Sequence, residues 1–233
     1  MMTPPITLDI WSDMMCPFCF IGKTQLDAAL SQLPDPGAIA VRWHSYQLAP
    51  HYEIDKSKNA HENLAAYKGL SVATAQELNA SVSQMAAQSG LVFDMDRMRW
   101  ANTFTAHRLL QYAKTQLLDH ALEQRLFEAV FSLGEDVDDV ATLTRIATAV
   151  GLPAAAVTEV LTGTAFSAEV TQDIAQSQAL GLRGVPFFLL NGQLPFSGAV
   201  GVAAFTQVLT EAYAQWKVTS TGDGASCTLD GSC

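Results

Sequence analysis

Segments that favour β-strands lie near both ends of this chain and are separated by a long stretch of helical sequence. Residues 6–11 and 38–46 are rich in β-branched and aromatic side chains, and residues 184–198 contain two further strand-like runs. Residues 60–166 are instead rich in Ala, Leu, Gln and Glu with almost no alternation, which favours four to six helices. We therefore predict an α/β fold in which one split domain carries an inserted all-helical domain.

Changes in composition suggest where these parts begin and end. We predict that residues 1–55 and 170–217 form the α/β domain and that residues 56–169 form the helical domain. Residues 218–233 are rich in Gly, Ser and Thr and contain two cysteines, which predicts a flexible C-terminal tail.

Local signals predict how the strands pair. The first two strands flank a helical stretch, residues 22–33, and the three segments have the size of a βαβ unit, so these strands should be parallel. Asn191-Gly192 separates the last two strand-like runs and favours a type I′ turn, so those runs should form a hairpin. Residues 201–216 predict a final amphipathic helix.

The charge balance disfavours several classes of partner. The chain has 13 Lys and Arg against 23 Asp and Glu, for a formal net charge of −10. Nucleic acids and anionic membranes attract basic surfaces, so neither is an expected partner. No apolar run approaches the roughly 20 residues that a transmembrane helix needs. The N-terminal segment MMTPPITLDIW lacks the features of a secretory signal, so we expect a cytoplasmic protein.

The four cysteines form two close pairs, Cys16 with Cys19 and Cys227 with Cys233. Four cysteines are too few to form a disulfide framework that would stabilise a chain of this length. Cys16 and Cys19 follow a strand and open a helix, where unpaired N–H groups and the helix dipole favour a thiolate. In related motifs this setting lowers a cysteine pKa from about 8.5 to about 3.5–7. Pro17 suits the first helical turn because no N–H partner is lost there.

This spacing predicts dithiol chemistry. We expect Cys16, as the more exposed thiol, to attack a disulfide and Cys19 to resolve the mixed disulfide. Two alternatives stay open: half of a zinc site, and an inert buried pair. A zinc site needs two further ligands, and no second close His or Cys pair lies in a suitable place apart from the tail, so we predict no metal.

A second element is Gly184-Val185-Pro186-Phe187, where a proline at the start of a strand makes Val185–Pro186 a candidate cis bond. Three segments carry a resemblance to a known family, and they are ITLDIWSDMMCPFCFIGK, NTFTAHRLLQYA and ALGLRGVPFFLLNGQLPFSGA. Over about residues 5–216 the sequence resembles the DsbA-like thioredoxin-fold family, specifically its FrnE-like subgroup. The resemblance implies a thioredoxin fold with a helical insertion and thiol–disulfide oxidoreductase activity.

Site residues follow from the same resemblance. It implies that Cys16 is the nucleophile, Cys19 the resolving thiol and Pro186 a cis residue beside them. It also implies that the backbone around Val185 pairs with an extended substrate, a form of strand addition. The expected substrates are protein or small-thiol disulfides. The only cofactor expected is the redox-active disulfide itself, with glutathione as a possible co-substrate.

A neighbouring branch of the family supplies the main alternative. It resembles kappa-class glutathione transferases and 2-hydroxychromene-2-carboxylate isomerase, which act with glutathione on small aromatic substrates. That branch typically has serine at the position of Cys16 and lacks the second cysteine, so the pair seen here favours dithiol exchange. The alternative stays open because the branch shares an Asn-x-x-x-x-His-Arg helix, present here as Asn102, His107 and Arg108.

Other residues near the motif have competing interpretations. Asn102 and His107 either line the active-site cleft or cap and pack a helix. Asp13 either accepts N–H groups of the turn, adds a like charge near the thiolate, or is an ordinary turn aspartate. Asp9, in the first strand, is a candidate buried proton relay for Cys19, a task that suits a carboxyl with a raised pKa.

The apolar residues around the motif are either core or substrate surface. We name Trp11, Pro17 and Phe18 as candidate contacts for unfolded substrates. An exposed apolar rim there is compatible with either a monomer or a homodimer.

The tail pair also has competing interpretations. Cys227 and Cys233 either form a second redox pair that exchanges with the first or lie in an end without function, and a metal site shared by both pairs is a third possibility. The 17 residues from Trp216 to Cys233 span roughly 56 Å when extended. A compact domain of this length has a radius of gyration of roughly 17 Å, so the tail can reach the first pair.

Overall fold

The computed structural model describes residues 5–222, and its centre is a four-stranded mixed sheet with strand order β2-β1-β3-β4. The strands are β1 (Ile6–Ser12), β2 (Ile39–Ser45), β3 (Phe187–Leu190) and β4 (Leu194–Ser197). β1 and β2 are parallel, whereas β3 is antiparallel to both β1 and β4. The predicted parallel pair and the predicted hairpin are both confirmed.

The hairpin turn follows from the residues that form it. Asn191 and Gly192 have φ values of 50° and 68°, and the Gln193 N–H donates to the Leu190 carbonyl at 3.1 Å. Two successive positive φ angles define a type I′ turn, which Asn-Gly adopts at low cost.

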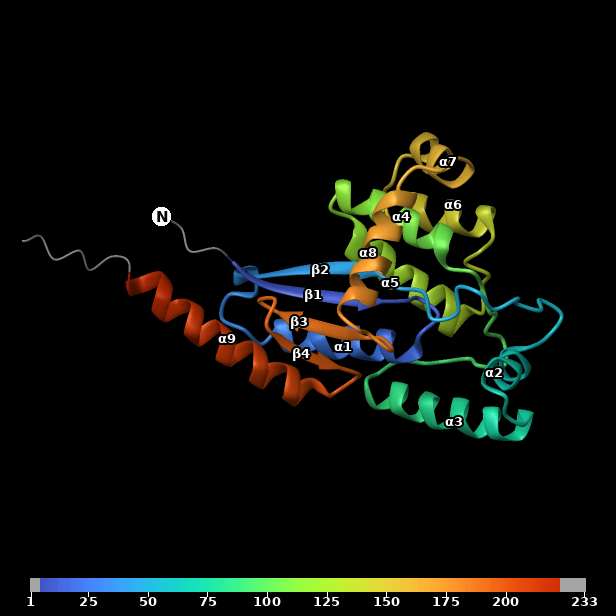
Figure 1. The fold of residues 1–233 in the computed structure, drawn as a ribbon, viewed down its shortest axis with the longest axis horizontal. Coiled ribbons are helices and arrows are strands. Elements are labelled where there is room, and N and C mark those ends of the chain that lie inside the picture. Colours follow the sequence, from blue (N-terminus) through green and yellow to red (C-terminus); the bar gives the residue numbers. More distant parts are fainter. Residues whose placement is uncertain (1–4, 223–233) are drawn as a thin grey trace, which may run out of the picture.

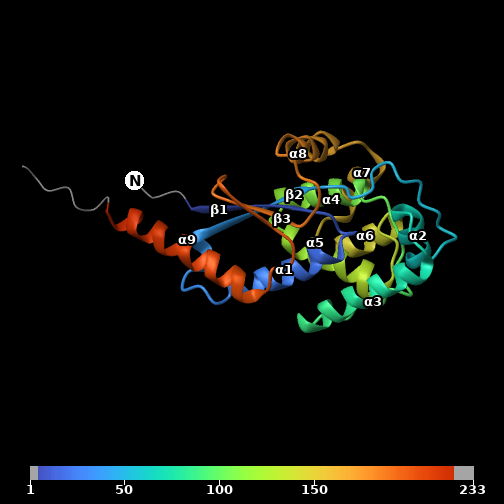
Figure 2. The same cartoon turned by 60° about the horizontal axis from the view of Figure 1, so that its bottom comes forward.

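Helices cover both faces of the sheet (Figures 1 and 2). The helices α1 (Pro17–Leu30) and α9 (Val202–Gly222) pack together on one face, and α8 (Ser167–Ala179) lies against β2 on the other. Side chains alternate along a strand, so Leu8 and Ile10 enter the core under α1 and α9, while Asp9 and Trp11 face α8. This alternation decides which residues of β1 can approach the cysteine pair.

Six α-helices and a π-helical segment lie within the described residues 60–162, between β2 and α8. They are α2 (Ala60–Lys68), α3 (Val72–Gln88), α4 (Phe104–Thr115), α5 (Asp119–Glu128), the π-helix Ala129–Leu133, α6 (Val140–Ala149) and α7 (Ala154–Thr162). A short 3₁₀ turn, Pro36–Ala38, precedes β2. Capping side chains begin three of these α-helices, since Asn59, Ser71 and Asp139 each accept a backbone N–H of the first turn.

Two apolar cores meet at α1. One core is built from β1, β3, α9 and the later turns of α1, including Leu26 and Ala29. The other fills the helical region and includes the first turn of α1, with Cys16, Cys19 and Phe20. The cysteine pair therefore lies where the α/β part and the helical part of the molecule meet.

Two predicted boundaries differ from the observed elements. The last helix continues to Gly222 rather than ending at residue 216. Residues 217–221 contain no glycine or proline, so nothing in that stretch ends the helix. The predicted boundary after residue 169 falls inside α8, and the division into domains stays a prediction. Within residues 5–222 no helix combines the length and apolarity needed to span a bilayer.

Candidate active site

Cys16 is the N-cap residue of α1, in extended conformation with φ −94° and ψ 111°. Its N–H donates to the Asp13 carbonyl at 2.9 Å, and its own carbonyl accepts the Cys19 N–H at 3.0 Å. Pro17 begins the helix without leaving an N–H unsatisfied. Both cysteines are free thiols, and Cys16 Sγ donates to the Val185 carbonyl at 3.3 Å. The geometry places a thiol at the positive end of the helix, held against the loop that precedes β3.

The two thiols lie next to each other and both are buried. Cys16 is 3% exposed and Cys19 is 1% exposed, so Cys16 is the more exposed of the two, as expected from the sequence, although neither is open to solvent. The reason is that the first turn of α1 packs into the helical core. Burial, followed by the neighbouring Cys16, raises the pKa of the Cys19 thiol well above its usual range. Cys19 therefore needs a proton acceptor before it can act as a nucleophile.

The Val185–Pro186 peptide bond is cis and lies beside the cysteine pair. Gly22, one turn after Cys19 in α1, allows this close approach, because a Cβ at Gly22 would lie 3.3 Å from Pro186 Cγ. The Pro186 carbonyl accepts the Gly198 N–H at 2.9 Å, which ties the loop to the end of β4.

A cavity of about 440 Å³ opens at Cys16. Its walls are mainly apolar, and they include Met15, Leu48, Tyr67, Trp100 and Val185. Pro17 and Phe18 also line this cavity, and Phe18 is 37% exposed, but their contact with substrate stays a prediction. Ligand sites of this kind combine an apolar surface with a few polar groups, which here include Gln47, Asn102 and Arg183.

Trp11 is wrongly predicted as a substrate contact. Its side chain is completely buried, because residue 11 faces α8 rather than the cavity. The ring stacks on His44 with centroids 4.5 Å apart, and its Nε1 donates to the Asp173 carbonyl at 3.2 Å. Trp11 is therefore part of the packing between the sheet and α8.

Asp13, Asn102 and His107 have separate roles. Asp13 accepts the Met15 N–H at 3.2 Å and the Leu48 N–H at 2.8 Å, so it does accept an N–H of its turn. Asn102 lines the cavity and also accepts the Phe104 N–H at 3.0 Å, so both of its interpretations apply. His107 is buried and its Nε2 donates to the Tyr46 carbonyl at 2.8 Å, which makes it a packing residue behind the cavity.

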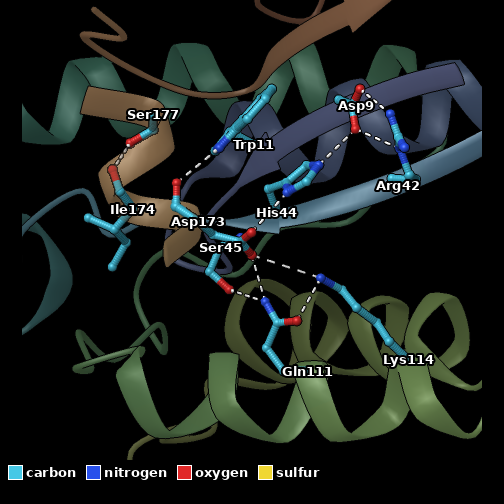
Figure 3. Close-up of polar contacts among 10 residues, drawn as sticks. All are labelled: Asp9, Trp11, Arg42, His44, Ser45, Gln111, Lys114, Asp173, Ile174 and Ser177. Carbon is cyan, nitrogen blue, oxygen red and sulfur yellow. Dashed lines mark hydrogen bonds and ion pairs between the residues drawn. The ribbon is translucent and has the colours of Figure 1, made fainter. Parts of the chain in front are cut away.

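Asp9 points toward Arg42 and His44 (Figure 3). Leu8 and Ile10 lie on the opposite face of β1 and are the side chains that meet α1, the helix of the cysteine pair. Arg42 donates two hydrogen bonds of 2.8 Å to the Asp9 carboxylate, and His44 Nε2 lies 2.8 Å from Oδ1. Burial opposes ionisation of Asp9, but the hydrogen bonds from Arg42 and His44 outweigh it and lower the pKa. The predicted relay with a raised pKa is therefore wrong for Asp9.

The same network joins the sheet to α8 and α4 through Asp173. His44 Nδ1 lies 2.9 Å from Asp173 Oδ1, so both ring nitrogens of His44 face carboxylates. Asp173 Oδ2 accepts the Ser45 N–H at 2.8 Å and Gln111 Nε2 at 2.6 Å (Figure 3). Burial raises the pKa of Asp173, but the hydrogen bonds from His44 and Ser45 together with the charge of Lys114 lower it by more, so the net shift is a decrease.

This network predicts acid sensitivity. A carboxyl with a lowered folded pKa adds stability above its unfolded pKa of about 3.9, and that stability is lost as pH falls toward the folded value. Asp173→Asn should lower the free energy of unfolding by about 2 kcal/mol at neutral pH and should flatten its decline in acid. Urea unfolding across the acidic range checks this. The control Glu77→Gln, at an exposed position, should keep the full decline. An equally steep decline in Asp173→Asn would contradict the assignment.

The sequence interpretation missed a buried carboxyl near the cysteine pair. Glu123 of α5 is 4% exposed, and burial raises its pKa to about 8. A signal for it exists, because Glu123 stands three and four residues before Leu126 and Phe127 and so shares their buried stripe. Lys23 of α1 is also fully buried and lies 2.8 Å from Asp27.

The tail cysteines, Cys227 and Cys233, lie outside the described residues. Within residues 5–222, no group of three or more His, Cys, Asp or Glu side chains is arranged to hold a metal ion.

Comparison with known proteins identifies related chains. The model of the DsbA-like thioredoxin domain matches residues 7–210. The solved structure of a probable DsbA oxidoreductase from Streptomyces coelicolor is 30% identical, covers 97% of this chain and 94% of its own, and superposes with a TM-score of 0.80.

Two more distant structures share the fold. A 2-hydroxychromene-2-carboxylate isomerase is 15% identical with a TM-score of 0.66, over 94% of this chain and 100% of its own. The cytosolic disulfide reductase DsbM from Pseudomonas aeruginosa is 16% identical with a TM-score of 0.63, over 90% of this chain and 99% of its own. Both the expected fold class and its main alternative branch are thus represented among the structural neighbours.

Proposed function

The chain belongs to the DsbA-like thioredoxin-domain family, and on that premise we propose that it is a thiol–disulfide oxidoreductase acting through Cys16 and Cys19. One observation carries the proposal: Cys16 is the N-cap of α1 with its partner thiol one turn away. The N–H groups and the dipole of the helix stabilise a sulfur anion at this position, which is what a nucleophilic thiol requires.

The proposed cycle has two exchanges. The Cys16 thiolate attacks one sulfur of a substrate disulfide, which forms a mixed disulfide and releases the other sulfur as a thiolate. Cys19 loses its proton and attacks Cys16 Sγ, which forms the Cys16–Cys19 disulfide and releases the second substrate thiolate. The substrate gains two electrons and the protein dithiol loses them. Run in reverse, the same steps oxidise a substrate dithiol.

Access to Cys16 favours an extended or small substrate. The thiol is buried from bulk solvent but lines the 440 Å³ cavity, so a disulfide must approach along that cavity and the Val185 loop. We propose that the backbone around Val185 and the surfaces of Pro17 and Phe18 contact the substrate. Protein disulfides and small disulfides such as that of glutathione remain the proposed substrate classes, and a FrnE-like assignment remains part of the proposal.

A cytoplasmic location is also kept as a proposal. The structural neighbour from Pseudomonas aeruginosa is described as a cytosolic disulfide reductase, which supports it. In a reducing compartment, the Cys16–Cys19 disulfide would be transient and catalytic rather than structural.

A second candidate function is a glutathione-dependent isomerisation or transfer on a small aromatic substrate. The apolar cavity with Tyr67 and Trp100 in its wall favours it, as does the structural likeness to the isomerase. Against it stands Cys19, because such a reaction needs one sulfur centre and gives a second thiol no task.

A redox titration tests the main proposal. The protein is equilibrated in glutathione buffers of graded potential, alkylated, and mapped by mass spectrometry. We expect Cys16 and Cys19 to link in one two-electron transition. If they never link while both thiols remain reactive, dithiol exchange is excluded. The same map shows whether Cys227 and Cys233 pair with each other or with the first pair, which tests the proposed second redox pair.

A further inference from the structure

Two buried polar atoms lie between β1 and α5 without an ordinary hydrogen bond. Within the described residues, Ser12 Oγ and Glu123 Oε2 find no partner of normal length and angle. Ser12 ends β1 and is 3% exposed, while Glu123 is 4% exposed. Leaving buried polar atoms unpaired costs free energy, so such groups are expected to have a function.

The Ser12 side chain lies on the face of β1 that meets α1, the helix of the cysteine pair. It has the same parity in β1 as Leu8 and Ile10, whose side chains enter the core under α1. The Ser12 hydroxyl favours the ionised forms of both Cys19 and Glu123, and so opposes the rise in pKa that burial causes in each, although it makes no hydrogen bond to either group. A cavity of about 10 Å³ also touches Ser12 and Glu123, and this is close to the minimum for one water molecule.

We propose that Glu123 accepts the proton of the Cys19 thiol during resolution and returns it in the reverse step, with Ser12 as the intermediate. The inference rests on the proposed function. Ser12 donates its hydroxyl proton to the Glu123 carboxylate and accepts the proton of Cys19. The Cys19 thiolate then attacks Cys16 Sγ, the disulfide forms, and the substrate leaves as a thiolate. Glu123 ends the step as the carboxylic acid, so protons and electrons balance.

The surroundings of Glu123 suit a group that changes its protonation. Burial raises its pKa to about 8 and Lys23 opposes that rise, so the two forms are close in free energy near neutral pH. The charged or titratable groups that face it come from several elements: Lys23 and Asp27 of α1, Asp119 of α5, His107 and Lys114 of α4, and His44 of β2.

Lys23, whose charge acts on Glu123, lies beside two side chains that reach solvent. Lys23 Nζ is buried, yet it lies 2.8 Å from Asp27 Oδ2 and 3.3 Å from His120 Nε2. Asp27 is 35% exposed and His120 is 60% exposed, so both side chains contact solvent. The surroundings of Glu123 are therefore connected to the protein surface through side chains that do not line the substrate cavity.

The test separates the two thiols by reacting the reduced full-length chain with one equivalent of the aromatic disulfide DTNB. A Cys227→Ser, Cys233→Ser background removes the tail thiols from the signal. The first nitrothiobenzoate released reports attack by Cys16, and the second reports resolution by Cys19. Glu123→Gln should slow the second release at least about tenfold near neutral pH and leave the first unchanged. Its second rate should rise about tenfold per pH unit, because solvent then removes the proton.

The controls decide between a proton-holding role and a structural one. Glu128→Gln changes a half-buried carboxyl at the other end of α5 and should leave both releases unchanged. Ser12→Ala should slow the second release with the same pH signature, which keeps the test decisive if Glu123→Gln fails to fold. A normal second release in Glu123→Gln, or an equal slowing of both releases at every pH, overturns the inference. A single release from the unaltered pair overturns the proposed function itself.

Discussion

Replacing Cys16 with serine is expected to lower the rate of disulfide exchange by about 10³-fold or more. A serine hydroxyl at the N-cap of α1 is not ionised near neutral pH and cannot form a disulfide, so the first covalent step is lost. The fold should be kept, since serine is a favourable N-cap residue of similar size. Reduction of insulin by the protein with a thiol donor, followed by turbidity, measures the effect.

A matched substitution gives the control. Cys233→Ser exchanges the same atoms in the tail and should leave the first, single-turnover reaction of Cys16 unchanged. If Cys16→Ser keeps more than a small fraction of the exchange rate, the nucleophile has been misassigned. Since the second candidate function depends on glutathione, the same variant should also be assayed for glutathione binding.

Replacing Cys19 with serine is expected to trap the intermediate that the cycle predicts. Attack by Cys16 still forms a mixed disulfide, but the neighbouring thiol that releases it is absent. An external thiol must then do so without the advantage of a fixed position, which should slow turnover by about 10²-fold or more. Mass spectrometry of Cys19→Ser after exposure to glutathione disulfide should show one glutathione bound at Cys16.

This variant also decides between the two candidate functions. Unchanged turnover in Cys19→Ser, together with tight non-covalent glutathione binding, would favour the isomerase or transferase reaction. A trapped adduct and slow turnover would favour dithiol exchange. The cavity beside Cys16 accommodates either reaction on grounds of size and polarity, so chemistry at Cys19 is the sharper criterion.

The proton-holding role of Glu123 changes how the buried pair is understood. Cys19 is 1% exposed, and burial raises its pKa, so water has poor access to its proton. A carboxyl reached through Ser12 from the helical region solves that problem without opening the core. The helical region would then supply part of the redox chemistry as well as the wall of the substrate cavity.

Local sequence was sufficient for the parts of this protein that depend on neighbours in the chain. A strand, a Cys-Pro-Phe-Cys segment and a helix in succession predict the thiol at a helix N-terminus, and the structure has that arrangement. Asn191-Gly192 predicts its hairpin turn for the same reason, since backbone preferences at two residues decide it.

The wrong predictions for Asp9 and Trp11 concern which face of β1 each side chain occupies. Both have odd residue numbers in β1 and lie on the face toward α8. Ser12 has an even number, as do Leu8 and Ile10, whose side chains lie on the face toward α1. Strand alternation alone separates these sets, but which set meets α1 depends on the side of the sheet that the crossover helix takes.

The packing of distant segments determined the rest. That α5 brings Glu123 to Ser12, that Asp173 of α8 pairs with His44 of β2, and that the first turn of α1 is buried in the helical core are contacts between segments far apart in the chain. Composition and periodicity describe each segment alone, whereas burial, pKa and access are properties of the space between segments. For that reason the nucleophile was predictable from local sequence, while its proton acceptor became visible only in the folded chain.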